Sequence, residues 1–125
     1  MNKIRGHPKA GFTLVEIMIV VAIIGLLAAI AIPNFMRARA KSQQNACINN
    51  LRQIDSAINE WAMETGQVTG ANIGGVSVIS AYIKLNSSSS VPGCPGGGTY
   101  STGAVAVVPQ VTCTLSTLTD TPHIY

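Results

Sequence analysis

Few residues of the chain have the types and the spacing that catalysis needs. The two histidines, His7 and His123, lie near opposite ends of the 125-residue sequence. Glu60 and Glu64 are one helical turn apart, so their carboxylates would be neighbours on an exposed helix face and would repel each other mildly. No acid–base pair is evident, and we therefore predict that the protein is not an enzyme and has no catalytic residues.

The cysteines and glycines match no common metal or phosphate site. Cys47, Cys94 and Cys113 lack the Cys-x-x-Cys spacing of typical zinc sites. The glycine run 96–98 is not followed by the Lys-Ser or Lys-Thr pair of a phosphate-binding loop. The sequence therefore predicts no metal ligand and no cofactor.

One charged residue is notable for its surroundings. Glu16 is the only charge in the 21 residues from Phe12 to Ile32, which are otherwise mostly apolar. A helix of that length spans roughly 30 Å, enough to cross a bilayer. An ionisable side chain costs about 2.5–3.5 kcal/mol at the membrane centre and less near its edge. We therefore expect Glu16 to have a partner that compensates its charge.

The positive charge of the chain is concentrated at its start. The formal net charge is +3, and Lys3, Arg5 and Lys9 supply three of the eight basic residues. Without residues 1–11 the chain has five basic and five acidic residues. Aromatic residues make up only 5% of the sequence and do not alternate with basic ones. These features argue against a protein that binds nucleic acid.

The segment that follows the apolar run continues the helical pattern with one apolar face. Large apolar side chains recur there at the three- and four-residue spacing of a single helix face. These residues are Ile48, Leu51, Ile54, Ile58 and Trp61. Gly66 is suited to end the helix after Thr65. The sequence thus predicts one helix over 12–65, hydrophobic all round in its first half and amphipathic in its second.

The remaining residues, 66–125, predict a small head. Four glycines in residues 66–75 predict a loop, whereas residues 76–85 predict a short helix or strand. Three further segments are rich in β-forming residues: 99–101, 104–108 and 111–115. Pro109-Gln110 is a candidate turn between the last two. A small antiparallel sheet packed on the apolar face of the helix would give an α+β fold.

The junction between the basic start and the apolar run carries a specific motif. Gly11-Phe12-Thr13-Leu14-Val15-Glu16, with Ile32-Pro33 at the end of the run, resembles the start of type IV prepilins and type II secretion pseudopilins. The resemblance implies cleavage between Gly11 and Phe12 by a prepilin peptidase, N-methylation of Phe12 and polymerisation into a filament. In that family the carboxylate that matches Glu16 pairs with the amino terminus of a neighbouring subunit.

The same resemblance implies the pilin fold and a division of the chain into four regions. These are a leader peptide (1–11), a transmembrane and assembly helix (12–33), its amphipathic continuation (34–65), and a loop with a small β-sheet head (66–125). We expect a subunit stored in the bacterial inner membrane with its leader in the cytoplasm, which then enters a periplasmic or extracellular filament. Its expected partners are further copies of itself, the peptidase, the membrane and an inner-membrane assembly platform.

A small anchored or secreted binding domain with an ordinary signal sequence is the alternative. A single-pass anchor would have a similar apolar run, and Ala29-Ile30-Ala31 fits the cleavage pattern of a secretory signal. The apolar region of such a signal is about 7–15 residues long, however, which is shorter than the run found here. Cleavage after Gly11 would support the filament subunit, whereas cleavage after Ala31 or no cleavage would support the alternative.

Gly25 and Pro33 are weak points in the apolar helix. Pro33 lacks an N–H and clashes with the carbonyl of Ala29. One interpretation is an ordinary kink, which membrane helices tolerate. The other is that residues 25–33 unwind locally when subunits pack into a filament, which would make Gly25 and Pro33 assembly residues together with Phe12 and Glu16.

The cysteine-containing segments resemble those of a group of short bacterial pseudopilin-like proteins. The resemblance rests on the motif CPGGGTY at residues 94–100, on Cys113, and on the helix segment 47–54. With export to an oxidising compartment, it implies a Cys94–Cys113 disulfide worth roughly 3 kcal/mol in the chain-entropy model, with Cys47 as a small buried hydrophobe. The alternative is a bond from Cys47 that joins the sheet to the helix.

Overall fold

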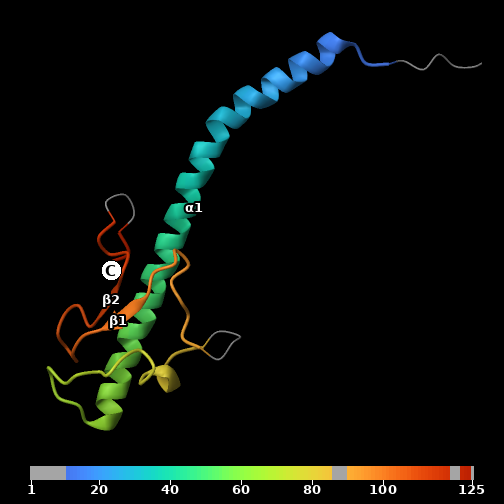
Figure 1. The fold of residues 1–125 in the computed structure, drawn as a ribbon. Helices are drawn as coiled ribbons and strands as arrows, with labels where there is room; N and C mark the ends of the chain where they lie inside the picture. Colours follow the sequence, from blue (N-terminus) through green and yellow to red (C-terminus); the bar gives the residue numbers. More distant parts are fainter. Residues whose placement is uncertain (1–10, 86–89, 119–121, 125) are drawn as a thin grey trace, which may run out of the picture. The chain divides into compact units, whose positions relative to one another are not determined.

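A computed structural model describes residues 11–85, 90–118 and 122–124. Its elements are, in order, helix α1 (Leu14–Thr65), 3-10 helix η1 (Ser80–Tyr82), strand β1 (Tyr100–Thr102) and strand β2 (Val111–Cys113) (Figure 1). The predicted α+β fold, a long amino-terminal helix and a small antiparallel sheet, is confirmed. Predictions that concern residues 1–10, including most of the leader and His7, lie outside the described residues. The chain divides into two compact units, 1–36 and 37–125, which are described separately.

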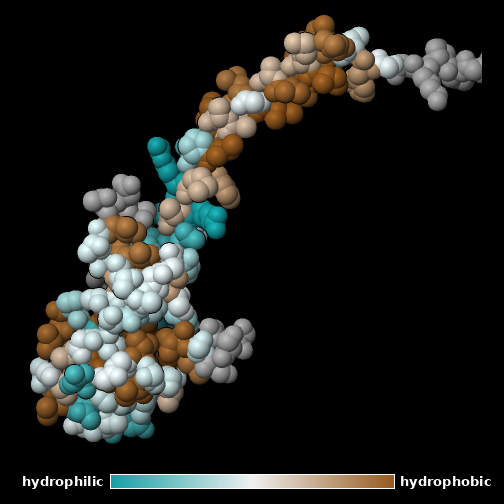
Figure 2. Space-filling model, in the orientation of Figure 1, coloured by the Kyte–Doolittle hydropathy of each residue, from teal (hydrophilic) through white to brown (hydrophobic). Residues whose placement is uncertain are grey.

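In the first unit, α1 is apolar on every side. Its most apolar 18-residue window has a mean hydropathy of 2.9, so the helix is long and apolar enough to cross a membrane. The large apolar side chains from Leu14 to Ile32 are each 50–75% exposed, because no other described residue of the unit covers them (Figure 2). Gly25 and Pro33 both lie inside α1, which continues through the two positions.

In the second unit, α1 buries a single face. Side chains at helical spacing are completely or almost completely buried along this face: Gln44, Cys47, Leu51, Ile54, Ala57, Ile58 and Ala62. The head packs Ile73, Ile79, Val105 and Val111 against them. Three residues of the predicted apolar face, Leu51, Ile54 and Ile58, are therefore buried as expected. The other two, Ile48 and Trp61, are only half-buried.

The sheet consists of two short antiparallel strands. Tyr100 of β1 pairs with Cys113 of β2, and Thr102 pairs with Val111. In β2 the side chains of Val111 and Cys113 are buried whereas Thr112 points outward, which is the alternation expected of a strand with one covered face. Residues 76–85, for which helix and strand were both open, form turns and the 3-10 helix η1.

The strand predicted over 104–108 is wrong. Apart from a single β-bridge between Ala104 and Asn72, this segment forms turns and bends. The reversal of the chain begins earlier than at Pro109, because Gly103 N already donates to Gln110 O at 2.8 Å. The buried Gln110 side chain holds the loop: its Oε1 accepts from Ala106 N at 2.8 Å, and its Nε2 donates to two side-chain oxygens of α1 at 3.1 Å each. A polar anchor therefore replaces a third strand.

Candidate functional site

The amino-terminal candidate site is built around the start of α1. Gly11, Phe12 and Thr13 precede the helix, so the predicted cleavage bond between Gly11 and Phe12 lies in non-helical backbone. Phe12 is 84% exposed, and no atom lies within 4 Å of the position that a Cβ on Gly11 would occupy. Among the described residues, therefore, none covers the bond.

Glu16 and Thr13 form a reciprocal cap on the helix. Glu16 Oε2 accepts from Thr13 N and from Thr13 Oγ1, both at 2.8 Å, and Glu16 N donates to Thr13 Oγ1 at 3.2 Å. This arrangement is a capping box, in which threonine at the cap and glutamate three residues later satisfy each other's backbone donors. The Thr-x-x-Glu pattern before an apolar run could have identified Thr13, which the sequence analysis did not assign a role.

The cap defines what Glu16 can offer to a neighbour. Its side chain is exposed, and both hydrogen bonds from Thr13 end on the same carboxylate oxygen. An ionised carboxylate has about four acceptor positions, so a further cation or donor can bind without breaking the cap. Glu16 therefore has a local partner, Thr13, for part of its capacity but no opposite charge within the described part of its own unit. Gly25 and Pro33 form no comparable site.

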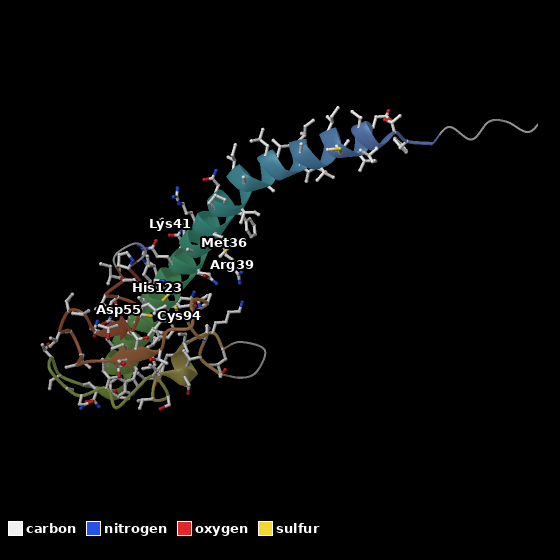
Figure 3. The ribbon with its side chains drawn as sticks, turned by 45° about the horizontal axis from the view of Figure 1, so that its top comes forward. Met36, Arg39, Lys41, Asp55, Cys94 and His123 are labelled. Carbon is white, nitrogen blue, oxygen red and sulfur yellow. The ribbon has the colours of Figure 1, made fainter. Side chains whose placement is uncertain are left out.

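A second constellation lies in the head, where four side chains with metal-ligating atoms converge. These are Cys47 from α1, Cys94 from the loop before β1, Cys113 from β2 and His123 near the carboxyl terminus. The ligand atoms of the four all lie within 4.8 Å of one another. Cys94 Sγ and His123 Nδ1 are 3.2 Å apart, and Figure 3 shows the two residues side by side against α1. All four side chains are buried, with exposures between 0% and 8%.

Hydrogen bonds from α1 hold the two irregular segments of this cluster. On either side of Cys94, the carbonyls of Gly93 and Pro95 accept from the side chains of Asn50 and Gln43 at 3.1 and 3.2 Å. Beside His123, the carbonyl of Pro122 accepts from Gln44 Nε2 at 2.6 Å. Polar side chains of one helix thus place a loop and a chain end that have no regular structure of their own.

The surroundings of the cysteines affect their protonation. Burial raises the pKa of the Cys47 thiol to about 12. Burial also acts to raise the pKa of Cys94, but hydrogen bonds from Cys47 and from the amides of Gly98 and Gly96 outweigh it and lower that pKa. The Tyr100 hydroxyl donates to Cys47 Sγ at 3.4 Å. Cys94 is thus the favoured negative sulfur of the cluster.

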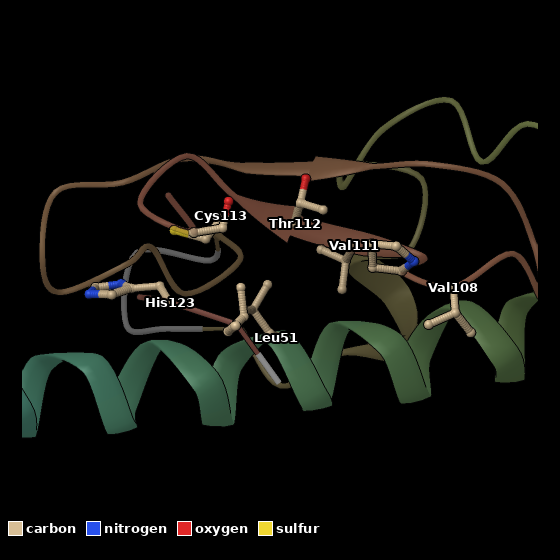
Figure 4. A pocket seen from close by; sticks show the side chains of 9 residues that line it. Leu51, Val108, Val111, Thr112, Cys113 and His123 are labelled. Atoms are coloured by element: carbon tan, nitrogen blue, oxygen red, sulfur yellow. The ribbon is translucent and has the colours of Figure 1, made fainter. Parts of the chain in front are cut away.

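A pocket of about 240 Å³ opens beside the cluster. Figure 4 shows it over α1, with Leu51 at its floor and with Cys113 and His123 on its wall. Apolar side chains, among them Val108 and Val111, form most of the rest. The pocket gives small solutes a path to two of the four clustered residues.

The structure bears on the roles predicted for the cysteines. All three cysteines are free thiols in the structure, so the Cys94–Cys113 disulfide stays a prediction. Cys47 is fully buried, as its assignment as a small hydrophobe requires. The prediction of no metal ligand rested on spacing along the chain, and that spacing did not reveal the convergence of the three cysteines with His123.

Comparisons with known proteins match parts of the chain. Residues 6–32 match the family model of the prokaryotic N-terminal methylation motif. The chain is 60% identical over 65 residues to the type IV major pilin protein PilA of Myxococcus xanthus, which covers 51% of this chain and 30% of that protein. It is 38% identical over 76 residues to a fimbrial protein of Neisseria meningitidis, covering 61% of this chain and 45% of the relative.

A secretion protein is also similar. The chain is 30% identical over 73 residues to the type II secretion system core protein G of Escherichia coli, covering 58% of this chain and 50% of that protein. The chain thus spans half or less of the length of these curated relatives. No solved structure matches the chain.

Proposed function

We propose that this chain, which carries the prokaryotic N-terminal methylation motif over residues 6–32, is a structural subunit of a pilus or of a type II secretion pseudopilus. The observation that carries the proposal is the start of α1. There a methylation motif meets a capped, acid-bearing helix end, and the apolar helix that follows is uncovered on all sides. A binding domain on an ordinary anchor also needs the apolar helix, and Glu16 could cap it there, but such a domain has no use for the methylation motif.

The uncovered helix suits two successive surroundings, the membrane and then the filament. Its apolar side chains need lipid or neighbouring subunits around them, because about 25 cal/mol is lost for each Å² of apolar surface left in water. We therefore infer storage in the bacterial inner membrane, followed by transfer into a filament where the same helices cover one another. Further copies of the chain, a prepilin peptidase and an inner-membrane assembly platform are the partners in this scheme.

Glu16 supplies the proposed specificity of assembly. Cleavage after Gly11 creates an α-amino cation on Phe12, and Glu16 lies four residues further along the chain. Each charge is costly in hydrocarbon. We propose that an incoming subunit places its Phe12 amino group against the Glu16 of a subunit already in the filament, which neutralises both charges and sets the axial register.

This scheme gives each region of the chain a role. Residues 1–11 act as a leader that is removed, residues 12–33 as the membrane and assembly helix, and residues 34–65 as the support of the head. Gly25 and Pro33 are the proposed positions at which the assembly helix adapts to its neighbours. The head, residues 66–125, faces the periplasm or the filament surface.

Processing and assembly test the proposal together. The chain is produced in cells with and without a prepilin peptidase, and the intact mass of the membrane-extracted protein is measured. We expect loss of residues 1–11 and one added methyl group on Phe12, only when the peptidase is present, and sedimentable fibres in a sheared fraction. Gly11→Leu is the matched control, because a Cβ at this position meets no described atom within 4 Å, and the leucine should block cleavage. A mature chain that begins at Ile32, or one that retains Met1 beside an active peptidase, would contradict the proposal and support the anchored or secreted domain.

A further inference from the structure

The cluster of three cysteines and His123 has no role in filament assembly as proposed above. We propose that these four side chains bind one zinc ion as a closed, tetrahedral structural site. The inference concerns the head alone and does not rest on the proposed function.

The geometry of the cluster is close to that of a tetrahedral site. A zinc ion bonds to sulfur at about 2.3 Å and to imidazole nitrogen at about 2.0–2.1 Å, so the ligand atoms of one site are roughly 3.5–3.8 Å apart. The four ligand atoms here all lie within 4.8 Å of one another. Side-chain movements on the order of 1 Å therefore complete the coordination. Three cysteines and one histidine are also one of the usual ligand sets of structural zinc.

Burial favours a structural ion over a reactive thiol. The 3.2 Å contact between Cys94 Sγ and His123 Nδ1 is also the geometry of a nucleophilic cysteine and its base. Such a pair has to reach its substrate, however, and Cys94 and His123 are only 8% and 3% exposed. Four protein ligands fill a tetrahedral shell and leave no open position, which is the arrangement of structural rather than catalytic zinc.

A hydroxyl donor points at one sulfur atom of the cluster. Cys47 Sγ accepts from the Tyr100 hydroxyl at 3.4 Å, and Tyr100 is itself positioned by Asn50 Nδ2 at 3.2 Å. Three thiolates on one zinc ion carry a net negative charge, and hydrogen bonds of this kind stabilise that charge and orient the ligands.

The loop between Cys94 and β1 is shaped to lie against the cluster. A Cβ on Gly96 would lie 2.8 Å from the His123 ring, and a Cβ on Gly98 would lie 2.7 Å from Cys113 Sγ. Cβ atoms essentially never come this close to another heavy atom, so a side chain at either position would have to displace a residue of the cluster. The two glycines thus allow the loop to close over the site.

A zinc ion uses all four residues, whereas a disulfide uses two. A Cys94–Cys113 bond would join the loop to β2 and would leave a buried thiol on Cys47 and a buried imidazole on His123. One ion joins α1, the loop, β2 and the carboxyl-terminal segment. These crosslinks would add substantially to the stability of a small head. Domains of this size often need a metal or a crosslink because their apolar core is limited. The adjoining pocket reaches Cys113 and His123 and gives the ion a path inward.

Metal content and thiol state of the full-length protein test the proposal. Thiols are alkylated in intact cells, and the protein is then mapped under non-reducing conditions. From a parallel, unalkylated culture it is extracted in detergent without chelator, and its zinc, iron and copper are counted. We expect about one zinc per chain, as for structural sites with four protein ligands. Chelation should make all three thiols reactive and lower the unfolding temperature, and added zinc alone should restore both properties.

Three variants separate metal binding from folding. His123→Ala should lower the zinc affinity at least tenfold, and Tyr100→Phe, which keeps the ring but removes the donor to Cys47, about tenfold. Leu51→Ala is the control, because it should lower the stability of the head while all four ligands remain, and it should still bind one zinc. A Cys94–Cys113 disulfide in metal-free protein would overturn the proposal. So would zinc that His123→Ala retains with unchanged affinity, or iron or copper in place of zinc.

Discussion

Removing the carboxylate of Glu16 tests how subunits pair, and the capping box at the start of α1 provides the control. Glu16→Ala removes both the charge and the hydrogen bonds that Thr13 donates to Oε2. Thr13→Ala removes the hydroxyl half of the same cap, including its bond from Glu16 N, and keeps the charge. A comparison of the two variants therefore separates the start of the helix from the electrostatic role of Glu16.

The two losses differ in size. A lost cap costs about 1 kcal/mol and frays the first turn of a helix that is otherwise 52 residues long. In Glu16→Ala the Phe12 amino group of the incoming subunit is left without its partner, and an unpaired charge at membrane depth costs up to about 2.5–3.5 kcal/mol. At about 1.4 kcal/mol per tenfold change, the second loss lowers the equilibrium for adding a subunit by up to on the order of 100-fold. We therefore expect Thr13→Ala to assemble within about tenfold of the parent, and Glu16→Ala to assemble poorly or not at all.

The assay compares fibre yield with membrane subunit levels. Shear-prepared fibres are quantified for the parent and for both variants, with the cleaved subunit in the membrane fraction as reference. Glu16→Asp should be intermediate, because its carboxylate is one methylene shorter, and Glu16→Gln should resemble Glu16→Ala because the charge is lost. Equal fibre loss in Thr13→Ala and Glu16→Ala would show that the cap is what matters. Normal fibre yield from Glu16→Ala would refute the charge pairing and leave apolar packing of the helices as the driver.

Three further predictions concern the stability of the head, measured by thermal unfolding of the detergent-extracted protein. Leu51→Ala should cost about 2–5 kcal/mol because Leu51 is fully buried, whereas Met63→Ala, at a position 79% exposed, should change stability by less than about 0.5 kcal/mol. Gln110→Ala should cost about 1–3 kcal/mol by breaking its three hydrogen bonds, and unchanged stability would show that the loop needs no polar anchor. Gly98→Ala should cost about 1–3 kcal/mol because its Cβ meets a cysteine sulfur at 2.7 Å, whereas Gly93→Ala, with open space around it, should be nearly neutral.

The long helix was predictable because its signals are local. The apolar residues from 48 to 61 mark one face at a period of 3.6, and Gly66 ends the helix where the structure ends it. The burial of Cys47 was expected, whereas Ile48 and Trp61, which the spacing places on the apolar face, are only half-buried. The capping role of Thr13 was also readable from the sequence, since Thr-x-x-Glu before an apolar run is a local pattern.

The third strand was mispredicted because β-propensity says which side chains suit the surface of a sheet. It does not say whether a neighbouring strand is there to pair with. Val105, Val107 and Val108 suit a strand, but a strand needs a neighbour for its backbone groups. The hydrogen bond from Gly103 to Gln110 closes the loop before such a neighbour exists, and the Gln110 side chain satisfies Ala106 N instead. The contacts that hold Gln110 lie on α1, about 50 residues away in the chain, and cannot be predicted from local composition.

The Cys–His cluster could not be predicted from spacing along the chain, but some residues near it gave a local signal. Zinc sites are recognised from close pairs such as Cys-x-x-Cys, which fix two ligands on one turn. Here each ligand comes from a different segment, so no pair exists, and the position of each depends on how the head folds onto α1. The local trace is the glycine run: Gly96 and Gly98 leave space that the His123 ring and Cys113 Sγ approach within 3 Å. A run of glycines beside a cysteine is thus evidence of something bulky that the backbone must approach, and the structure identifies it as the remaining members of the cluster.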